Sequence, residues 1–427
     1  MSTDTTDPRK LSRRSVLKGA AGALFLSPLL MGLGTGNAAA GPLESRPARG
    51  KGGTHNTRLV LLGTTGGMTW WPGCNRASNS QALLVGDAMY VIDLGFGSMQ
   101  RMAEAFNWSH FTLSADGQKT QLELSSFLSN LRAVFITHLH MDHLGDYPTF
   151  LEIGARAGFG VPKPLPIIGP GDRGRLEENR SGYTGTVAKT DSADPAKITA
   201  TPGTRLLTDH ILQAFAQTFN NCTHDENYPD IPKIIDIREI GDPKAIPWPA
   251  GFTPPDPGKP WTSAETCPAM EPFEIFKDDR IRVTATLVDH YEVYPSFAFR
   301  FDTEDGSLVI SGDTGPDTKG NLQKLARGAD VLVHEVLDDA WIDAAFKGVK
   351  EGDPAWPLYY HAITAHTPIS KVGKVAEDCR VKTLVLSHIA PGNTPVSRLK
   401  KAKQGFSGRL IVGEDLLEIG VGRARKA

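Results

Sequence analysis

One heptapeptide of the chain concentrates side chains that bind metal ions. Residues 137–143 read Thr-His-Leu-His-Met-Asp-His, so three histidines and one aspartate fall within six positions. In an extended segment His138 and His140 would face one side, and Asp142 and His143 would follow as the chain turns into a helix. Such a cluster can address two metal ions about 3.5–4 Å apart, as in two-metal hydrolytic sites. The heptapeptide therefore predicts metal-dependent hydrolysis.

Three further ligand candidates stand where apolar runs end. His290 follows the run 283–289, Asp313 follows the run that ends in Ser-Gly at 311–312, and His388 follows the run 384–387. Histidine and aspartate are ordinary ligands of divalent transition metals, and the two oxygens of Asp313 could bridge two ions. The sequence therefore predicts that seven side chains meet at strand ends to form a dinuclear site.

The elements that must position these residues alternate between strands and helices. Apolar runs predict strands at 58–62, 82–85, 89–92, 131–136, 282–288, 297–301, 308–311, 331–333 and 383–386. Helices are predicted at 99–106, 317–327, 338–346 and 368–378. This alternation predicts an α/β fold made of two halves of similar pattern, with helices on the outside.

The middle of the chain does not follow this pattern. Residues 158–265 are rich in turn residues, and their later part contains several prolines and Trp248. Loops of this length are usually functional when ordered. We expect a hydrolase domain at 58–420, interrupted by a lid-like insertion at 158–265, with a linker at 41–57 and a short tail at 421–427.

The first forty residues resemble an export signal. Ser12-Arg13-Arg14 precedes a weakly apolar run at 19–33, and the small residues 37–40 suit a signal peptidase. The run contains Pro28 and lacks the ~20 apolar residues of a membrane helix. The pattern predicts a twin-arginine signal peptide over residues 1–40. It implies a periplasmic or secreted protein, the twin-arginine export machinery as a partner, and no stable membrane insertion.

Composition and charge exclude other classes of protein. The chain has 427 residues, of which 40% are hydrophobic and 22% charged, so general disorder is excluded. Its formal net charge is −2, and removal of residues 1–40 takes away five basic and two acidic side chains, which leaves −5. Because nucleic-acid binding needs a basic face, the charge predicts a small-molecule ester substrate and no nucleic acid. A homodimer is left open.

The four cysteines form no Cys-x-x-Cys pair, so a thiolate zinc site is not expected. In an oxidising compartment a disulfide between Cys222 and Cys267 is one of several possible pairings.

The order of these motifs resembles the metallo-β-lactamase superfamily, and within it the ribonuclease Z and arylsulfatase-like branch. The resemblance rests on His-x-His-x-Asp-His at 138–143, Ser-Gly-Asp-Thr at 311–314, Ser-His at 387–388 and shorter matches at 62–64, 75–78, 92–95, 333–335 and 365–367. It implies a four-layer αββα sandwich with the site at one edge. The motifs are specific for the fold and only weakly specific for the substrate.

The resemblance also assigns roles to the ligands. It implies one metal ion held by His138, His140, His290 and Asp313, and a second held by Asp142, His143, Asp313 and His388. Nitrogen and oxygen ligands favour zinc, while manganese and iron remain open. The family position of a catalytic histidine falls on His366, with Glu335 to orient it.

Catalysis would use hydroxide made from water whose pKa the two ions lower. Asp142 would orient the hydroxide, and His366 would protonate the leaving alkoxide. His334 is expected to pack behind the site.

Aromatic side chains in the surrounding loops predict an apolar substrate pocket, lined by Trp70, Trp71, Trp248, Trp261, Trp356 and Tyr360. The sequence thus predicts a periplasmic metal-dependent hydrolase of a sulfate ester or phosphodiester. Two alternatives stay open: a lactonase or β-lactamase-type acyl hydrolase, and a diiron oxidoreductase of the same fold.

Overall fold

A computed structural model of the chain describes residues 55–67, 70–106, 110–113, 120–123, 128–157, 159–160, 162–190, 198–257 and 263–424. All of these residues belong to one compact unit, which spans residues 42–427. The predicted signal peptide at 1–40 and Trp261 lie outside the described residues. No helix among the described residues is long and apolar enough to cross a bilayer.

Most of the strands form two seven-stranded sheets. The first has the order β16-β1-β2-β3-β6-β7-β8 and the second the order β15-β14-β13-β12-β11-β10-β9. The first sheet contains β1 (Thr57–Gly63), β2 (Ser80–Val85), β3 (Ala88–Ile92), β6 (Leu131–Phe135), β7 (Leu165–Pro170), β8 (Ile235–Ile240) and β16 (Glu418–Gly420). The second contains β9 (Phe273–Lys277), β10 (Ile281–Leu287), β11 (Phe297–Thr303), β12 (Ser307–Ile310), β13 (Val331–Leu337), β14 (Thr383–Ala390) and β15 (Arg409–Val412). A separate hairpin pairs β4 (His110–Leu113) with β5 (Thr120–Glu123).

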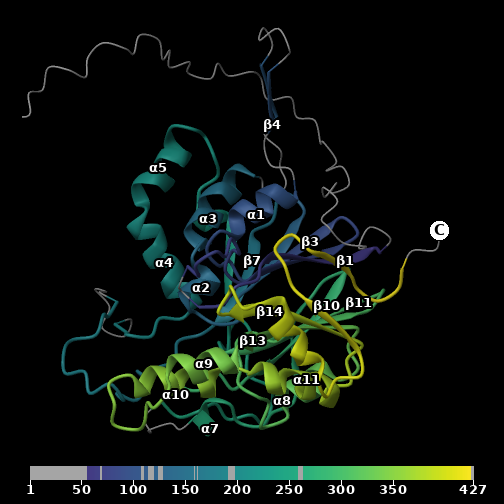
Figure 1. Cartoon of the computed structure of the whole chain (residues 1–427). Coiled ribbons are helices and arrows are strands. Elements are labelled where there is room, and N and C mark those ends of the chain that lie inside the picture. Colours follow the sequence, from purple (N-terminus) through teal and green to yellow (C-terminus); the bar gives the residue numbers. More distant parts are fainter. Residues whose placement is uncertain are drawn as a thin grey trace, which may run out of the picture. The chain divides into compact units, whose positions relative to one another are not determined.

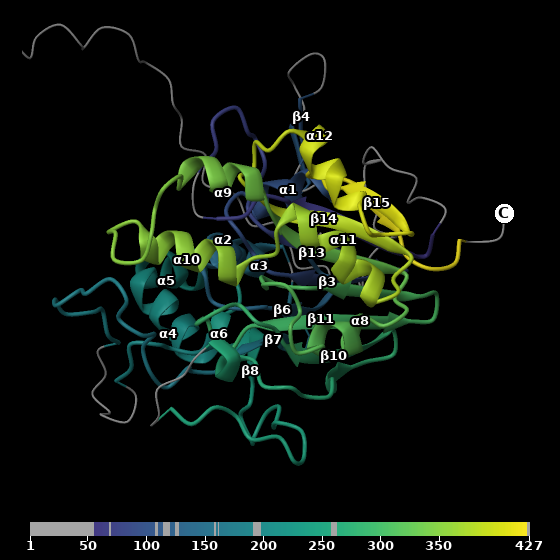
Figure 2. The ribbon, with the colours of Figure 1, turned by 60° about the horizontal axis from the view of Figure 1, so that its bottom comes forward.

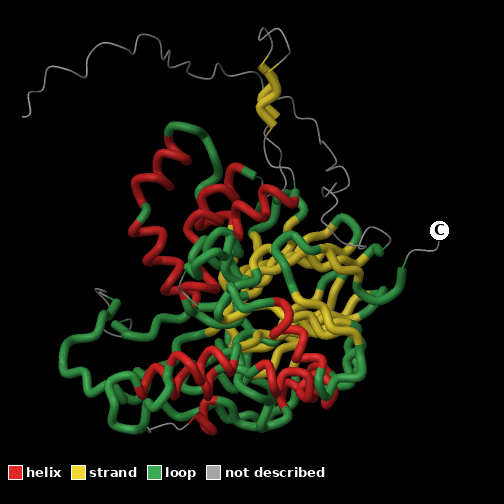
Figure 3. Tube along the Cα trace, in the orientation of Figure 1, coloured by secondary structure: helices red, strands yellow, loops and turns green. Residues whose placement is uncertain are grey.

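The helices cover the outer faces of the two sheets (Figures 1 and 2). Those on the side of the first sheet are α1 (Ser98–Ala105), α3 (Tyr147–Arg156), α4 (Thr204–Ala214), α5 (Ala216–His224) and α6 (Ile231–Ile234). Those on the side of the second are α8 (Asn321–Ala326), α9 (Asp339–Ala345), α10 (Trp356–Ala365) and α11 (Ile369–Asp378). Short helices are α2 (Met141–Leu144), α7 (Ser263–Thr266), α12 (Val396–Leu399) and a 3₁₀ turn at Lys400–Lys403. Figure 3 shows the strands of the two large sheets gathered between the helices. The four-layer αββα sandwich is confirmed.

Alternation along the strands builds three apolar layers. In β1, Leu59 and Leu61 pack between the two sheets, whereas Val60 and Leu62 pack under the helices of the first sheet. Successive side chains of a strand point to opposite faces, so a strand that is apolar throughout must be covered on both. A third cluster lies between the second sheet and α8 and α11. Strands that are apolar on both faces are thus buried on both faces, by the other sheet on one side and by helices on the other.

The segment 158–265 differs from the irregular insertion that was expected. It contributes two strands, β7 and β8, to the first sheet, and it carries α4 and α5. Two prolines and Gly169 in Leu165–Pro170 hid the first of these strands, because such residues usually mark turns. Among the described residues of this segment, only the stretches around the strands and helices, such as 171–190 and 198–203, are loops.

Both ends of the domain are also more integrated than expected. Thr57 was assigned to the linker 41–57, but it is the first residue of β1. Val421 is fully buried and its N–H donates to the Thr57 carbonyl, so it is no part of a free tail. β16 returns the chain to pair with β1, and the end of the sequence thereby completes the first sheet.

The disulfide between Cys222 and Cys267, one of the pairings that the sequence left open, is not formed. Both thiols are free and buried. Cys222 lies on α5, where its sulfur accepts a hydrogen bond from Arg156, and Cys267 belongs to the core between the sheets. The two cysteines flank one segment of the sequence, but sequence position does not determine the layer of the fold in which a side chain lies. Cys222 and Cys267 lie in different layers.

Candidate metal centre

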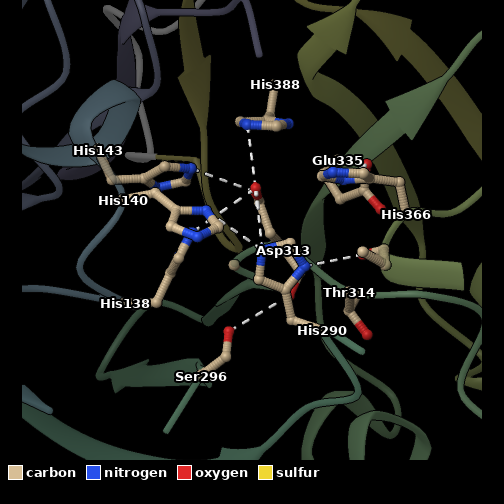
Figure 4. A network of polar contacts seen from close by, with 12 residues as sticks. His138, His140, His143, His290, Ser296, Asp313, Thr314, Glu335, His366 and His388 are labelled. Carbon is tan, nitrogen blue, oxygen red and sulfur yellow. Dashed lines mark hydrogen bonds and ion pairs between the residues drawn. The ribbon is translucent and has the colours of Figure 1, made fainter. Parts of the chain in front are cut away.

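All seven predicted ligands converge at one edge of the sandwich. Figure 4 labels all of them except Asp142. His138 and His140 follow β6, and α2 begins at once to place Asp142 and His143. From the second sheet, His290 follows β10, Asp313 follows β12 and His388 lies within β14. Each sheet therefore contributes a part of the site from the ends of its strands.

The ligand atoms form two groups. In the first group are His138, His140 and His290, and in the second are Asp142, His143, Asp313 and His388; within each group the candidate ligand atoms lie within 4.8 Å of one another.

Asp313 stands between the two groups. Its Oδ2 lies 3.8 Å from His138 Nε2 and 3.9 Å from His290 Nε2. On the other side, Oδ2 lies 3.1 Å from His388 Nε2, and Oδ1 lies 3.3 Å from His143 Nε2. The arrangement matches the predicted division of the ligands and allows Asp313 to serve both groups.

The donor set fits divalent metal ions. His138 Nε2, His143 Nε2 and Asp313 Oδ1 are buried and make no hydrogen bond with any described residue. Buried polar atoms are rarely left without a partner, and ions bound by the two groups would satisfy all three. Imidazole nitrogens and carboxylate oxygens suit zinc and related ions.

The electrostatics of the site favour bound positive charge. Burial lowers the pKa of His138 and His290 well below the usual value, so both rings are neutral, as metal ligation requires. Burial also disfavours a charged His143, yet Asp313, Asp93 and Asp142 raise the pKa of this ring well above its usual value. Three carboxylates around one imidazole thus create a field that a cation would complement.

Asp93 is a functional residue to which the sequence assigned no role. It is fully buried at the end of β3, and its carboxylate accepts hydrogen bonds from the Thr137 N–H at 2.8 Å, the Thr137 hydroxyl at 2.9 Å and Asn79 at 3.0 Å. It also lies 2.8 Å from His143 Nδ1, which turns Nε2 of that ring toward the site. Its φ of 56° lies in the left-handed region, which residues other than glycine seldom adopt, although aspartate does so more often than most. In the sequence, Asp93 is a single aspartate after a predicted strand, and no motif marks it as an orienting residue. The only hint was the short family match at 92–95.

Backbone groups hold two other ligands in place. His290 Nδ1 donates to the carbonyl of Ala365 at the end of α10, at 2.9 Å, which leaves Nε2 for the site. The N–H of Gly67 donates to Asp142 Oδ2 at 2.8 Å. The adjacent Gly66 passes so close to His388 that an added Cβ would lie 2.4 Å from the imidazole ring.

His366 and Glu335 form a pair beside the metal ligands (Figure 4). His366 Nδ1 lies 3.4 Å from Glu335 Oε2, and the ring stacks on His388 with centroids 5.7 Å apart. Burial disfavours the charged ring, but the Glu335 carboxylate raises the pKa of His366 to about 9. The His366 side chain retains 15% exposure, so it can reach a substrate from the open side. His334 is fully buried and points Nδ1 at the Glu335 carbonyl, as expected of a packing residue.

The aromatic residues predicted to line the pocket lie in different environments. Trp248 packs on Phe252 and Phe297 against the core between the sheets, so its assignment to the pocket is wrong. Trp70 is 84% exposed, and Trp71 donates from Nε1 to the Gly66 carbonyl. Trp356 stacks on Tyr360 along α10, and Tyr360 contacts Tyr291, which follows His290.

A cavity that the sequence did not predict opens beside His140. Its volume is about 230 Å³. It is lined by Leu139, His140, Pro170, Gly171, Arg173, Glu177, Thr201, Pro202, Leu207, Val293, Tyr294 and Pro295. Most of these residues lie on loops without periodicity, so no sequence pattern could bring them together.

Comparisons with known proteins agree with this geometry. Residues 112–258 match the family described as the metallo-beta-lactamase superfamily. The chain is 27% identical over 369 residues to the ribonuclease Z of Mycobacterium bovis (strain BCG / Pasteur 1173P2), an alignment that covers 85% of this chain and 98% of that protein. It is 26% identical over 375 residues to the ribonuclease Z of Mycobacterium avium (strain 104), with the same coverage of both chains.

One solved structure supports the fold. The crystal structure of the short form of human tRNase Z superposes with a TM-score of 0.50 at 18% identity, and the match covers 86% of this chain and all of that one. Both mycobacterial relatives carry the name ribonuclease Z, and the likeness to arylsulfatases stays a prediction.

These relatives contradict the prediction of a small-molecule ester substrate and no nucleic acid. They are named for an action on RNA. The prediction failed because net charge is a sum over the whole chain, whereas recognition depends on the local potential at the site. Two divalent ions would reverse the sign of that potential among the carboxylates.

The fold, the paired ligand groups and the relatives lead to one conclusion. The chain has the metallo-β-lactamase fold and is a metal-dependent hydrolase.

Proposed function

We propose that the chain hydrolyses phosphodiester bonds and that its substrate is RNA. The carrying observation is the pair of ligand groups that meet at Asp313, at an edge of the sandwich open to solvent through His366. The likeness to proteins named ribonuclease Z supports this substrate class.

The chemistry is divided between bound ions and side chains. Two bound divalent ions, zinc in our proposal, would lower the pKa of a water molecule and neutralise charge on the phosphoryl oxygens. Asp142 Oδ2, fixed by the Gly67 N–H and by His388 at 3.1 Å, orients the attacking oxygen from the second group.

His366 is the proton donor in this proposal. The leaving alkoxide needs a proton, and His366 is held by Glu335 within ring contact of both His290 and His388. Glu335 is itself fixed, because its Oε1 accepts a hydrogen bond from the Thr367 N–H. A buried carboxylate that orients an imidazole and stabilises its charged form is a familiar device of acid catalysis.

Hydrolysis of RNA by metal-loaded protein tests the proposal. We expect cleavage of a labelled RNA oligonucleotide and of bis(p-nitrophenyl) phosphate, and far slower turnover of p-nitrophenyl sulfate and p-nitrophenyl acetate. Asp142→Ala should abolish the diester activity. Met141→Ala is the matched control, because Met141 lies in the same heptapeptide, is 58% exposed and offers no ligand atom. Faster turnover of the sulfate or the acetate than of either diester would refute the proposal.

We also propose that residues 1–40 export the folded protein through the twin-arginine route. The support is the Arg13-Arg14 pair before an apolar run that ends in small residues. Replacement of both arginines by lysine should retain the protein in the cytoplasm. Unchanged export of that variant would contradict the proposal.

A further inference from the structure

The cavity beside His140 adjoins the metal centre directly. His140 lines the cavity, and its Nδ1 lies 3.5 Å from His290 Nε2 in the first ligand group. Leu139 separates His138 from His140 and also faces the cavity. A group that is covalently attached to a phosphate at the metals could therefore enter this space.

The lining has the character of a pocket for a flat ring. Its walls are apolar, with Leu139, Leu207 and Val293 beside prolines at 170, 202 and 295. Arg173, Glu177 and Thr201 add polar side chains to the lining. Apolar walls with a few polar groups suit a ring whose faces are apolar and whose edge carries donors and acceptors.

One buried carboxylate holds the two sides of the cavity together. Glu292 lies two residues after the ligand His290 and just before the wall residue Val293. Its Oε2 accepts a hydrogen bond from the Glu178 N–H at 3.0 Å and lies 3.8 Å from Arg173, whose side chain is only 4% exposed. Its Oε1 accepts from Arg180 at 3.1 Å. The loop that carries Arg173 and Glu177 is thus tied to the strand end that carries His290.

The volume limits what can be bound. An apolar cavity of about 150 Å³ accommodates one benzene ring. The cavity of about 230 Å³ therefore has room for a single base and excludes a stacked base pair.

We propose that this cavity binds the base of the nucleotide next to the scissile phosphate. The inference rests on the proposed phosphodiester hydrolysis and deepens it, because it makes the unpaired base next to the cut a determinant of recognition. Leu207 on α4 forms the wall whose size can be changed without touching a metal ligand.

A binding measurement tests this without turnover. Zinc-loaded protein is titrated calorimetrically with uridine 3′-monophosphate and, separately, with inorganic phosphate. In wild type the nucleotide should bind about tenfold or more tightly than phosphate, as burial of one ring implies. In Leu207→Trp the indole fills the cavity, so the two affinities should come within about twofold.

Leu212→Trp is the matched control. Leu212 lies on the same helix, is half-buried and does not line the cavity, so this variant should keep the wild-type ratio. Leu207→Ala enlarges the cavity and should favour adenosine 3′-monophosphate over the uridine nucleotide. Metal content and circular dichroism establish that each variant is folded.

The outcomes separate the two proposals. An unchanged ratio of nucleotide to phosphate affinity in folded Leu207→Trp, or no preference for the nucleotide in wild type, would overturn the cavity assignment. A preference that Leu207→Trp removes, in a protein that cleaves no phosphodiester, would confirm the cavity and refute the proposed reaction.

Discussion

At the scale of single residues, the ligands were predictable and the residues that orient them were not. His138, His290 and Asp313 each follow an apolar run, so their sequence positions implied a place at a strand end. Asp93 also follows a strand, but its contacts reach Thr137 and His143, more than forty residues away. Such long-range hydrogen bonds depend on tertiary packing, and no local pattern encodes them.

We expect Asp93→Asn to weaken metal binding by about 10–100-fold, the usual effect of losing a carboxylate behind a ligating histidine. The asparagine amide is uncharged, so it accepts a weaker hydrogen bond from His143 Nδ1 than the carboxylate does. The imidazole ring is then held less firmly in the orientation that ligation needs. Competition with a chromogenic chelator measures the affinity. Asp87→Asn, on the exposed turn between β2 and β3, should have no effect. Equal affinities in wild type and Asp93→Asn would disprove the orienting role.

His366→Ala should lower kcat by about 10²–10⁴ for a diester with an alkoxide leaving group, because that group needs a proton. The loss should be much smaller when p-nitrophenolate leaves, since this anion is stable without one. Metal content should stay unchanged. Because His366 also lies near His290 and Asp313, loss of an ion from this variant would identify it as a ligand instead of an acid. His361→Ala, with a neighbouring ring on α10, is the control.

At the scale of elements, the turns at the strand ends decide how close the ligands come. Gly312 has a φ of 61°, and a Cβ there would lie 2.5 Å from the Phe297 carbonyl, so glycine is what allows this close approach before Asp313. The loop after β1 passes equally close to His388 at Gly66. The sequence revealed the strands because apolar runs are local, whereas the path of residues 171–190 and the cavity they border follow from contacts such as those of Glu292.

Gly66→Ala should displace the His388 ring and empty the second ligand group while the first is retained. The expected result is a fall from two ions per chain to about one, measured by elemental analysis after dialysis. Gly73→Ala is the control from the same loop, because nothing lies within 4 Å of the added methyl group. The φ of 70° at Gly73, which Gly66 does not share, adds only local strain at a position that touches no ligand. If Gly66→Ala still bound two ions per chain, the loop would be able to move away from His388 without loss of a metal ion, and the prediction would be wrong.

At the scale of the whole molecule, the site joins the two halves of the sandwich. The first half supplies His138, His140, Asp142 and His143, and the second supplies the other three ligands. The layers were predictable because strands that are apolar throughout need cover on both faces. The positions of β7 and β8 in the first sheet were not, and the substrate class inferred from net charge was wrong.

Because the ions would bridge both halves, their removal should destabilise the whole fold. At a free metal concentration 1,000 times the Kd, binding adds about 4 kcal/mol to the free energy of unfolding. Thermal unfolding with and without a chelator should therefore show a clearly lower Tm for the metal-free protein, and His138→Ala should reduce the difference. A Tm that the chelator leaves unchanged would exclude ions that link the halves.

The central claim is a dinuclear site that cleaves phosphodiesters, and a metal titration tests it most directly. Metal-free protein is titrated with Zn²⁺ while hydrolysis of an RNA oligonucleotide is followed. The rate should rise to a plateau at two equivalents per chain and stay near background in Asp313→Ala. Full activity without metal, a plateau at one equivalent, or no hydrolysis at two equivalents would contradict the claim.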